Sequence, residues 1–198
     1  MRIVFATSEA NPYIKSGGLA DVLGSLPKAL VQKGHECIVV LPKYQDMKLA
    51  ETLEYVASYD IWVGWRKCYC GVFTAKHDGV TYYFIDNEQY FRRPGLYGYD
   101  DDNERFAFFD FAVLELMSHV DIKPDILHLH DWQTAMIATL YKERYAYYEY
   151  YQGIKIVFTI HNIAYQGKCD PKLLSDHFGL DNYLYYNGNC RNDGCFNM

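Results

Sequence analysis

The segment Lys15-Ser16-Gly17-Gly18 has the residue types of an anion-binding turn. It follows an apolar run and precedes leucines at helical spacing, so its free backbone amides are expected at a helix N-terminus. The helix dipole favours a phosphate there, and paired glycines let a ligand approach the backbone closely. Lys15 adds a full positive charge. A Gly-Gly pair before a helix is also common in plain tight turns, so both interpretations stay open.

This turn differs from two well-known nucleotide-binding patterns. The sequence forms no G-x-G-x-x-G, and no Walker-type Lys-Ser/Thr follows, which disfavours a dinucleotide-binding oxidoreductase and a P-loop protein. Asp21 stands on the first turn of the following helix. It is either a favourable charge at the helix N-terminus, worth about 0.3–1 kcal/mol, or a side chain that faces a sugar beside a bound phosphate. Glu9 carries the same ambiguity.

Two further polar clusters follow apolar runs later in the chain. One is His128, His130 and Asp131-Trp132, and the other is His161-Asn162 followed by Tyr165-Gln166-Gly167. In open parallel α/β sheets, ligands bind beyond the carboxyl ends of the strands. We therefore expect all three polar clusters to converge on one edge of the sheet.

Histidine at the end of a buried strand is more often a core residue than a ligand. His128 and His130 are expected on the same strand face, and at least one of them in a structural role. His161 is the better functional candidate, because Asn162 and a polar loop with a glycine follow it directly. No carboxylate or cysteine stands at a matching metal-ligand offset, so we predict no metal and no cofactor.

The elements that must position these clusters begin with a strand over residues 2–8, a helix over 18–33 and a strand over 36–41. This order of strand, Gly-containing loop, helix and strand opens a parallel α/β sheet. Pro27 inside the helix predicts a kink, because proline removes one backbone donor. Residues 59–65, 68–76 and 81–86 then predict strands, with a tight turn at Asp78-Gly79. These form an antiparallel insert or an extension of the sheet.

The second half of the chain returns to the α/β pattern. Residues 91–102 are expected to form a loop, and Asn103 to cap a helix. A strand over 125–130 precedes Asp131, which can cap a helix from about residue 132 to 148. A strand over 155–161 follows, then a short helix that starts at Asp170-Pro171 and ends near Gly179. We predict one Rossmann-like domain, a parallel sheet flanked by helices with an antiparallel β insert. Nothing in residues 187–198 is expected to terminate a fold.

Composition limits the partners of this chain. The formal charge is −6, with no block of lysine and arginine of the kind that nucleic-acid binding requires. No apolar run approaches the ~20 residues that span a bilayer, so no membrane partner is expected. The six cysteines form no C-x-x-C pair, and no signal peptide is found, which favours reduced thiols and a cytoplasmic location.

Tyrosine is abundant, at 20 of 198 residues, and it is concentrated between residues 141 and 151. Aromatic faces stack on sugar rings, so a contact with a glucan is one interpretation of this cluster. A helix that packs some of these tyrosines and exposes others is the alternative, and it is the one we favour.

Several segments, taken in order, resemble one family. They are Lys15-Ser16-Gly17-Gly18-Leu19-Ala20-Asp21-Val22 with Gly34-His35-Glu36, Arg93-Pro94-Gly95-Leu96-Tyr97, Asp102-Asn103 with Arg105-Phe106, His130-Asp131-Trp132, and Phe158 to Gly167. The sequence is similar to bacterial glycogen synthases and plant starch synthases over nearly its whole length.

The resemblance implies the GT-B arrangement of two Rossmann-like domains that face a cleft. It also implies transfer of glucose from ADP-glucose to the non-reducing end of an α-1,4-glucan, with retention and without a catalytic metal. Lys15, Gly17 and Gly18 would hold the diphosphate. His161 would hydrogen-bond the glucosyl unit, with Asp21 near the donor sugar. The acceptor side would be lined by Asp131, Trp132, Asn162, Tyr165 and Gln166.

The sequence departs from the family in two places. Ser16 stands where threonine is usual, which keeps the hydroxyl. The chain also stops near Phe196-Asn197-Met198, where the family continues into a second, nucleotide-binding domain. We therefore expect residues 1–198 to be the N-terminal domain, inactive by itself. The alternatives are a domain of another GT-B glycosyltransferase or a non-catalytic glucan-binding module.

Overall fold

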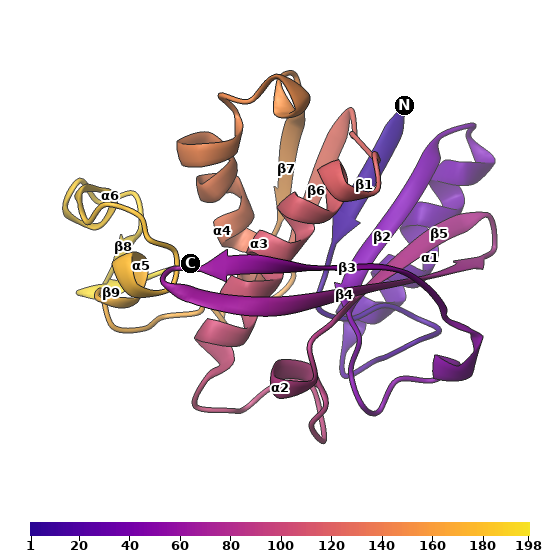
Figure 1. Cartoon of the computed structure of the whole chain (residues 1–198), viewed down its shortest axis with the longest axis horizontal. Coiled ribbons are helices and arrows are strands. Elements are labelled where there is room, and N and C mark those ends of the chain that lie inside the picture. The colour runs from indigo at the N-terminus through magenta and orange to yellow at the C-terminus, as the bar shows by residue number, and fades with distance from the viewer.

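The apolar runs of the sequence come together in one seven-stranded sheet flanked by helices, in a computed structural model that describes residues 1–198 (Figure 1). At its centre, β1 (Arg2–Ala6) pairs in parallel with β2 (Glu36–Pro42), from Arg2 opposite Glu36 to Ala6 opposite Val40. Both strands are almost entirely buried, since neighbours cover them on both faces. The predicted strand–helix–strand opening is confirmed.

The crossover between these strands is α1 (Gly18–Gln32), which packs against β2 and β5 (Val80–Asp86). Pro27 is buried inside α1, and the helix runs through it as one element. Gly34, with a φ of 83°, follows the helix and adopts the left-handed conformation that glycine tolerates best. The amide-rich turn therefore leads directly into the N-terminus of α1.

The strand order is β3-β4-β5-β2-β1-β6-β7. Of the two alternatives for the middle segment, the structure shows an extension of the sheet, because β5 pairs in parallel with β2. The antiparallel strands β3 (Glu54–Val63) and β4 (Arg66–His77) continue from β5 and are longer than predicted. Figure 1 shows this long hairpin passing in front of α3 (Asp102–His119). A single turn of 3-10 helix, Ala50–Thr52, precedes β3.

The helix α3 begins earlier than predicted. Its N-cap is Asp101 and not Asn103, and it follows the short α2 (Glu88–Phe91) and a loop. Three adjacent acidic residues compete for the cap position here. The side chain of Asp101 pairs with Arg93, and that of Asp102 accepts the amide of Gly98 at 2.7 Å. The cap therefore forms without a side-chain hydrogen bond.

The third parallel unit carries the later polar clusters. β6 (Ile126–His130) pairs with β1, and β7 (Lys155–Thr159) pairs with β6, all in parallel. Between them, α4 (Trp132–Leu140) ends at Leu140 and continues as a π-helical turn, Tyr141–Tyr145, and a 3-10 turn, Glu149–Tyr151. The prediction of one helix to residue 148 was therefore wrong. The strand β7 ends at Thr159, two residues before His161.

The tyrosine cluster mixes packed and exposed side chains. The hydroxyl of buried Tyr145 donates to Glu115 at 2.6 Å, and that of buried Tyr151 donates to the carbonyl of Leu114 at 2.9 Å. Tyr147 and Tyr148 are exposed. Packing against α3 therefore accounts for the two buried tyrosines.

The last segment folds back on the domain. It contains α5 (Leu173–Asp176), α6 (Tyr183–Tyr186) and a hairpin of β8 (Arg191–Asn192) and β9 (Cys195–Phe196). Phe196 is fully buried, and its backbone exchanges two hydrogen bonds with Cys169. The six cysteines are unpaired. No helix combines the length and the apolar character needed to cross a membrane.

Candidate active site at the carboxyl edge of the sheet

A cavity of about 940 Å³ lies at the carboxyl ends of β1, β6 and β7, where the three polar clusters were expected to converge. Four segments line it: the turn after β1, the loop before α3, the start of α4 and the loop after β7. Its lining includes Glu9, Ser16, Gly17, Gly18, Tyr97, Gly98, Asp102, Asp131, Trp132, His161, Asn162 and Tyr165. The amide-rich turn and His161 thus border one cavity, although they are far apart in the sequence.

The amide-rich turn already holds a carboxylate. Glu9, only 4% exposed, accepts hydrogen bonds from the backbone amides of Ser16 and Gly17, and from the Ser16 hydroxyl at 3.1 Å. The Tyr97 hydroxyl lies 3.4 Å from the same carboxylate and 2.7 Å from the hydroxyl of Ser8. Burial, together with the nearby Glu9 charge, raises the pKa of Tyr97. The sequence left the role of Glu9 open, and the structure makes it the internal anion of this turn.

The two charged residues that flank this turn face each other. Lys15 Nζ lies 2.7 Å from each oxygen of Asp21, and Asn11 donates to the same carboxylate at 2.7 Å. Neither Lys15 nor Asp21 is among the residues that line the cavity. Both side chains are about half exposed, so their ion pair is worth little and can open at low cost. The candidate phosphate ligand and the candidate sugar contact are therefore paired with each other on the surface.

Asp131 is the N-cap residue of α4, as predicted, but its side chain makes no capping hydrogen bond. Its carboxylate reaches across to the end of β7, where it accepts the backbone amides of His161 at 2.6 Å and Asn162 at 3.4 Å. Its φ of 59° and ψ of 179° fall in a region that favours glycine, at a cost of about 1–3 kcal/mol. Strain of this kind persists where the surroundings fix it, here by the hydrogen bonds that join β6 to β7. Asp131 therefore positions the loop that begins with His161.

Three histidines lie together at this edge. The rings of His128 and His130 are 4.2 Å apart, which places both on one face of β6. His128 Nε2 contacts the Thr159 hydroxyl at 2.7 Å, and His130 Nδ1 lies 2.8 Å from His161 Nε2. Burial, and to a lesser degree the neighbouring imidazoles, lowers the pKa of His130 to about 3, so that ring is neutral. Only His161 of the three reaches the cavity.

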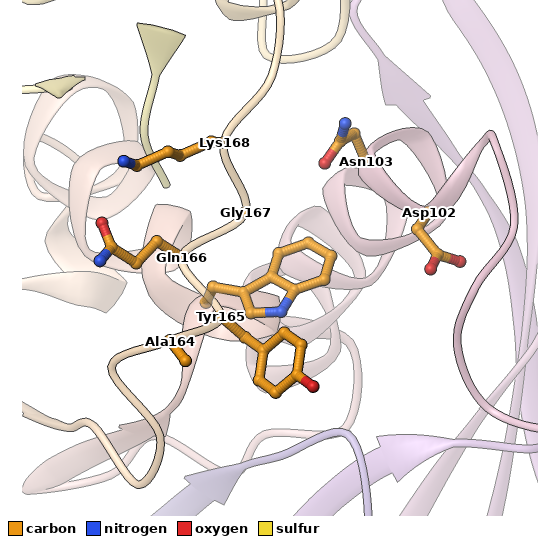
Figure 2. A pocket seen from close by; sticks show the side chains of 8 residues that line it. Asp102, Asn103, Ala164, Tyr165, Gln166, Gly167 and Lys168 are labelled. Atoms are coloured by element: carbon orange, nitrogen blue, oxygen red, sulfur yellow. The ribbon is translucent and has the colours of Figure 1, made fainter. Parts of the chain in front are cut away.

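A smaller hollow of about 380 Å³ shares the walls formed by Asp102, Trp132 and Tyr165. Figure 2 shows Gln166 and Lys168 on one side of it and Asp102 and Asn103, at the start of α3, on the other. The Gln166 amide is held by its own loop, donating to the carbonyl of Ile163 at 2.9 Å. Tyr165 is exposed, and Trp132 is half-buried against Phe106. Trp132 and Tyr165 line both hollows, which therefore share an aromatic wall.

Gly167 fixes the position of that aromatic wall. Its φ is 60°, and a Cβ placed there would lie 2.6 Å from the Trp132 ring. By contrast, a Cβ on Gly18 would meet nothing within 4 Å, and one on Gly17 would meet only Glu9 at 3.8 Å. The glycines of the turn are therefore not required by packing within this chain, which leaves room for a ligand against their backbone.

Several residues at the site were missed as individual candidates from the sequence. Tyr97, Gly98 and Asp102 line the cavity, although they lie in a loop that was interpreted only as a connection. The available signal was that Tyr97 and Asp102 belong to two of the segments that carry the family resemblance.

Comparison with known proteins agrees with this geometry. The family model described as "Starch synthase catalytic domain" matches residues 2–198. The chain belongs to the starch synthase catalytic domain family. Glycogen synthases of Clostridium kluyveri and of Clostridium botulinum strain Alaska E43 are 48% and 50% identical to it over 196 residues, or 98% of this chain. The catalytic domain of starch synthase IV from Arabidopsis thaliana, bound to ADP and acarbose, superposes with a TM-score of 0.89 at 32% identity over 99% of this chain.

These starch synthase relatives are longer than the chain described here. It spans 41% of the length of either clostridial glycogen synthase and 41% of the starch synthase IV chain. The match to starch synthase IV also identifies the sheet as the N-terminal Rossmann-like half of a GT-B glycosyltransferase. The chain is thus the N-terminal part of a glycosyltransferase catalytic domain.

Proposed function

We propose that residues 1–198 form the N-terminal domain of an ADP-glucose-dependent glycogen synthase. The complete protein would transfer glucose from ADP-glucose to the non-reducing end of an α-1,4-glucan, with retention of configuration. One observation carries this proposal: a turn with accessible glycine backbone and His161 border the same cavity, and aromatic side chains continue from it. A sugar diphosphate and a glucan chain need these two kinds of surface side by side.

In this proposal the turn receives the diphosphate of the donor. The Gly18 amide lies at the N-terminus of α1, where the helix dipole favours negative charge. The ammonium group of Lys15 would move from Asp21 to a phosphate oxygen, a short exchange because both side chains are exposed. The Gly17 amide would become available to a phosphate only if its hydrogen bond to the Glu9 carboxylate breaks. These groups would stabilise the charge that develops on the leaving diphosphate.

The other residues are assigned to the sugar and the acceptor. His161 would hydrogen-bond the glucosyl unit, and Asp21 would lie near the donor sugar once Lys15 is drawn away. Trp132 and Tyr165 would contact the faces of acceptor sugar rings, flanked by Asp131, Asn162 and Gln166. Six unpaired thiols fit a reducing, cytoplasmic location.

The separate chain is expected to bind weakly and not to catalyse. Relatives contain more than twice as many residues, and glucosyl transfer requires water to be kept out of a site that here is open. We expect no elongation of maltoheptaose by the 198-residue chain with ADP-glucose. Robust ADP-glucose-dependent elongation would contradict the assignment of these residues as an incomplete site.

Separate binding measurements distinguish the proposal from its alternatives. We expect calorimetry or NMR titration to detect both ADP-glucose and maltoheptaose. A non-catalytic glucan-binding module would bind maltoheptaose alone. A domain of a different GT-B glycosyltransferase would bind another sugar nucleotide, such as UDP-glucose, at least as well as ADP-glucose and would not respond to maltoheptaose.

A further inference from the structure

The end of β6 places His130 directly behind His161. His130 is only 1% exposed, and its Nδ1 lies 2.8 Å from Nε2 of His161, with the two rings inclined by 24°. On its other sides His130 packs against Phe5, whose ring centroid is 6.0 Å away, and against His128. The facing nitrogens of His130 and His161 are thus joined by one hydrogen bond, in which one nitrogen must donate and the other accept.

The surroundings of His130 decide which nitrogen donates. Its second nitrogen, Nε2, is buried and has no hydrogen-bond partner. If His161 Nε2 were the donor, neutral His130 would carry its proton on Nε2 as a buried N–H without an acceptor, an arrangement that folded proteins rarely show. If His130 Nδ1 donates, its Nε2 is a buried lone pair without a donor. The second arrangement leaves no orphaned N–H.

This arrangement fixes the proton of His161 as well. Since Nε2 of His161 accepts, a neutral His161 carries its proton on Nδ1, which has no partner within the chain. The hydrogen bond that one ring nitrogen makes sets the state of the other. His161 then offers a hydrogen-bond donor from a side chain that lines the cavity.

We propose that His130 is a positioning residue: its Nδ1–H holds His161 in the Nδ1-protonated tautomer and fixes the ring, so that His161 donates to an oxygen of the bound sugar nucleotide. This inference rests on the proposed function for the identity of the ligand, but the tautomer follows from the geometry alone. It gives consecutive residues separate tasks at one loop: Asp131 holds the backbone amide of His161, and His130 holds its ring.

Long-range ¹H–¹⁵N spectra of the histidine-labelled chain at neutral pH test the tautomer directly. In the wild type we expect a pyrrole-type Nδ1 and a pyridine-type Nε2 for His161. In His130→Phe, which keeps an aromatic ring but has no donor, the proton of His161 is expected to shift to Nε2. In His130→Asn, whose amide nitrogen stands near the former Nδ1, the wild-type pattern is expected to return.

Two results overturn the proposal. One is a wild-type spectrum with the proton on Nε2 of His161, which decides the matter even if a variant does not fold. The other is an unchanged His161 pattern in folded His130→Phe. A core residue with a purely structural role would alter stability in both variants without this tautomer shift and its rescue by asparagine.

Titration with ADP-glucose then tests the consequence for binding. We expect the wild type and His130→Asn to show a response at His161, and His130→Phe to bind about tenfold more weakly, since one hydrogen bond is lost. Equal affinity in His130→Phe would overturn the positioning role. A wild-type chain with the expected tautomer and no response to ADP-glucose would instead count against the proposed function, while the assignment of the proton would stand.

Discussion

The carboxylate of Glu9 accepts the backbone amide of Gly17 at 3.1 Å, so the turn assigned to a phosphate already holds an anion. The same carboxylate also accepts hydrogen bonds from the backbone amide and the hydroxyl of Ser16. Without a ligand, the turn is therefore kept in shape by a residue of its own chain. A diphosphate must either use the amide of Gly18 beside Glu9 or displace Glu9 from Gly17.

Glu9→Gln tests whether this carboxylate shapes the turn. A neutral amide keeps one acceptor oxygen and turns N–H donors toward the backbone N–H groups. We therefore expect hydrogen exchange at Ser16 and Gly17 to accelerate about tenfold or more, as charge-assisted hydrogen bonds are lost. Glu36→Gln, which removes an exposed carboxylate paired with Arg2, is the matched control and should leave this turn unaffected. Unchanged exchange at both amides in a folded Glu9→Gln chain would refute the assignment.

The variant Lys15→Ala distinguishes binding of the sugar-nucleotide donor from binding of the glucan acceptor. Loss of the ammonium group is expected to weaken ADP-glucose binding roughly tenfold or more, the value of a charge-assisted hydrogen bond, and to leave maltoheptaose binding unchanged. Lys28 is a suitable control, since it forms an equally exposed pair with Asp78 at 2.6 Å, away from the cavity lining. Both variants should lose no more than about 1 kcal/mol of stability. Equal donor affinity in Lys15→Ala and Lys28→Ala would remove Lys15 from the site.

The burial of Asp110 is expected to make the stability of the chain depend on pH in an unusual way. Its carboxyl group is fully buried in α3 without a hydrogen-bond partner, and burial raises its pKa well above the ordinary value. Between the unfolded pKa of ~3.9 and the raised folded pKa, the folded chain binds one proton more than the unfolded chain. The contribution of Asp110 to stability therefore falls as pH rises, by about 1.4 kcal/mol per pH unit.

Asp110→Asn removes this titration. The difference in unfolding free energy between Asp110→Asn and the wild type should grow in favour of the variant as pH increases from about 4 toward neutrality. Urea unfolding across this range measures it, and all other titrating groups cancel in the difference. A difference that stays constant with pH would show that Asp110 is ionised in the folded chain or solvated there.

Gly167→Ala tests the link between the loop after β7 and the aromatic wall. Gly167 and Gly188 both have positive φ, but only at Gly167 does a Cβ collide with Trp132. Gly188→Ala therefore reports backbone strain alone, about 1 kcal/mol, and the further loss in Gly167→Ala reports the displaced indole. We expect altered tryptophan fluorescence and weaker maltoheptaose binding in Gly167→Ala only. Identical behaviour of the two variants would mean that Trp132 tolerates the added methyl group.

The order of strands and helices in the central sheet could be predicted from the sequence, because the patterns that indicate these elements are local. Apolar β-branched runs at residues 2–6 and 36–42, with leucines at helical spacing between them, specify a parallel unit without knowledge of distant contacts. The same logic places polar strand ends at one edge, which is where the cavity lies. Several adjacent residues before α3 can each cap a helix, and local sequence signals do not distinguish between them. The predicted N-cap was therefore wrong by two residues.

The contacts that define the site were not accessible in this way. The pair of His130 and His161 depends on the β6–β7 register, which sets His130 opposite Thr159. The hydrogen bond from the Gly17 amide to the Glu9 carboxylate depends on how the chain folds back after β1. Asp131 has the residue type of a helix cap, yet its carboxylate accepts a hydrogen bond from the backbone amide of His161, just after β7. The two-residue strands β8 and β9 are too short to carry a periodic signal.

The most direct test of the central claim is an amide and imidazole NMR titration of the chain with ADP-glucose. If the turn and His161 border one sugar-diphosphate site, shifts are expected together at Gly17, Gly18 and His161, and inorganic pyrophosphate should reproduce those of the two glycines. Shifts confined to one side of the cavity, or a saturating response elsewhere on the surface with none at these residues, would contradict the account.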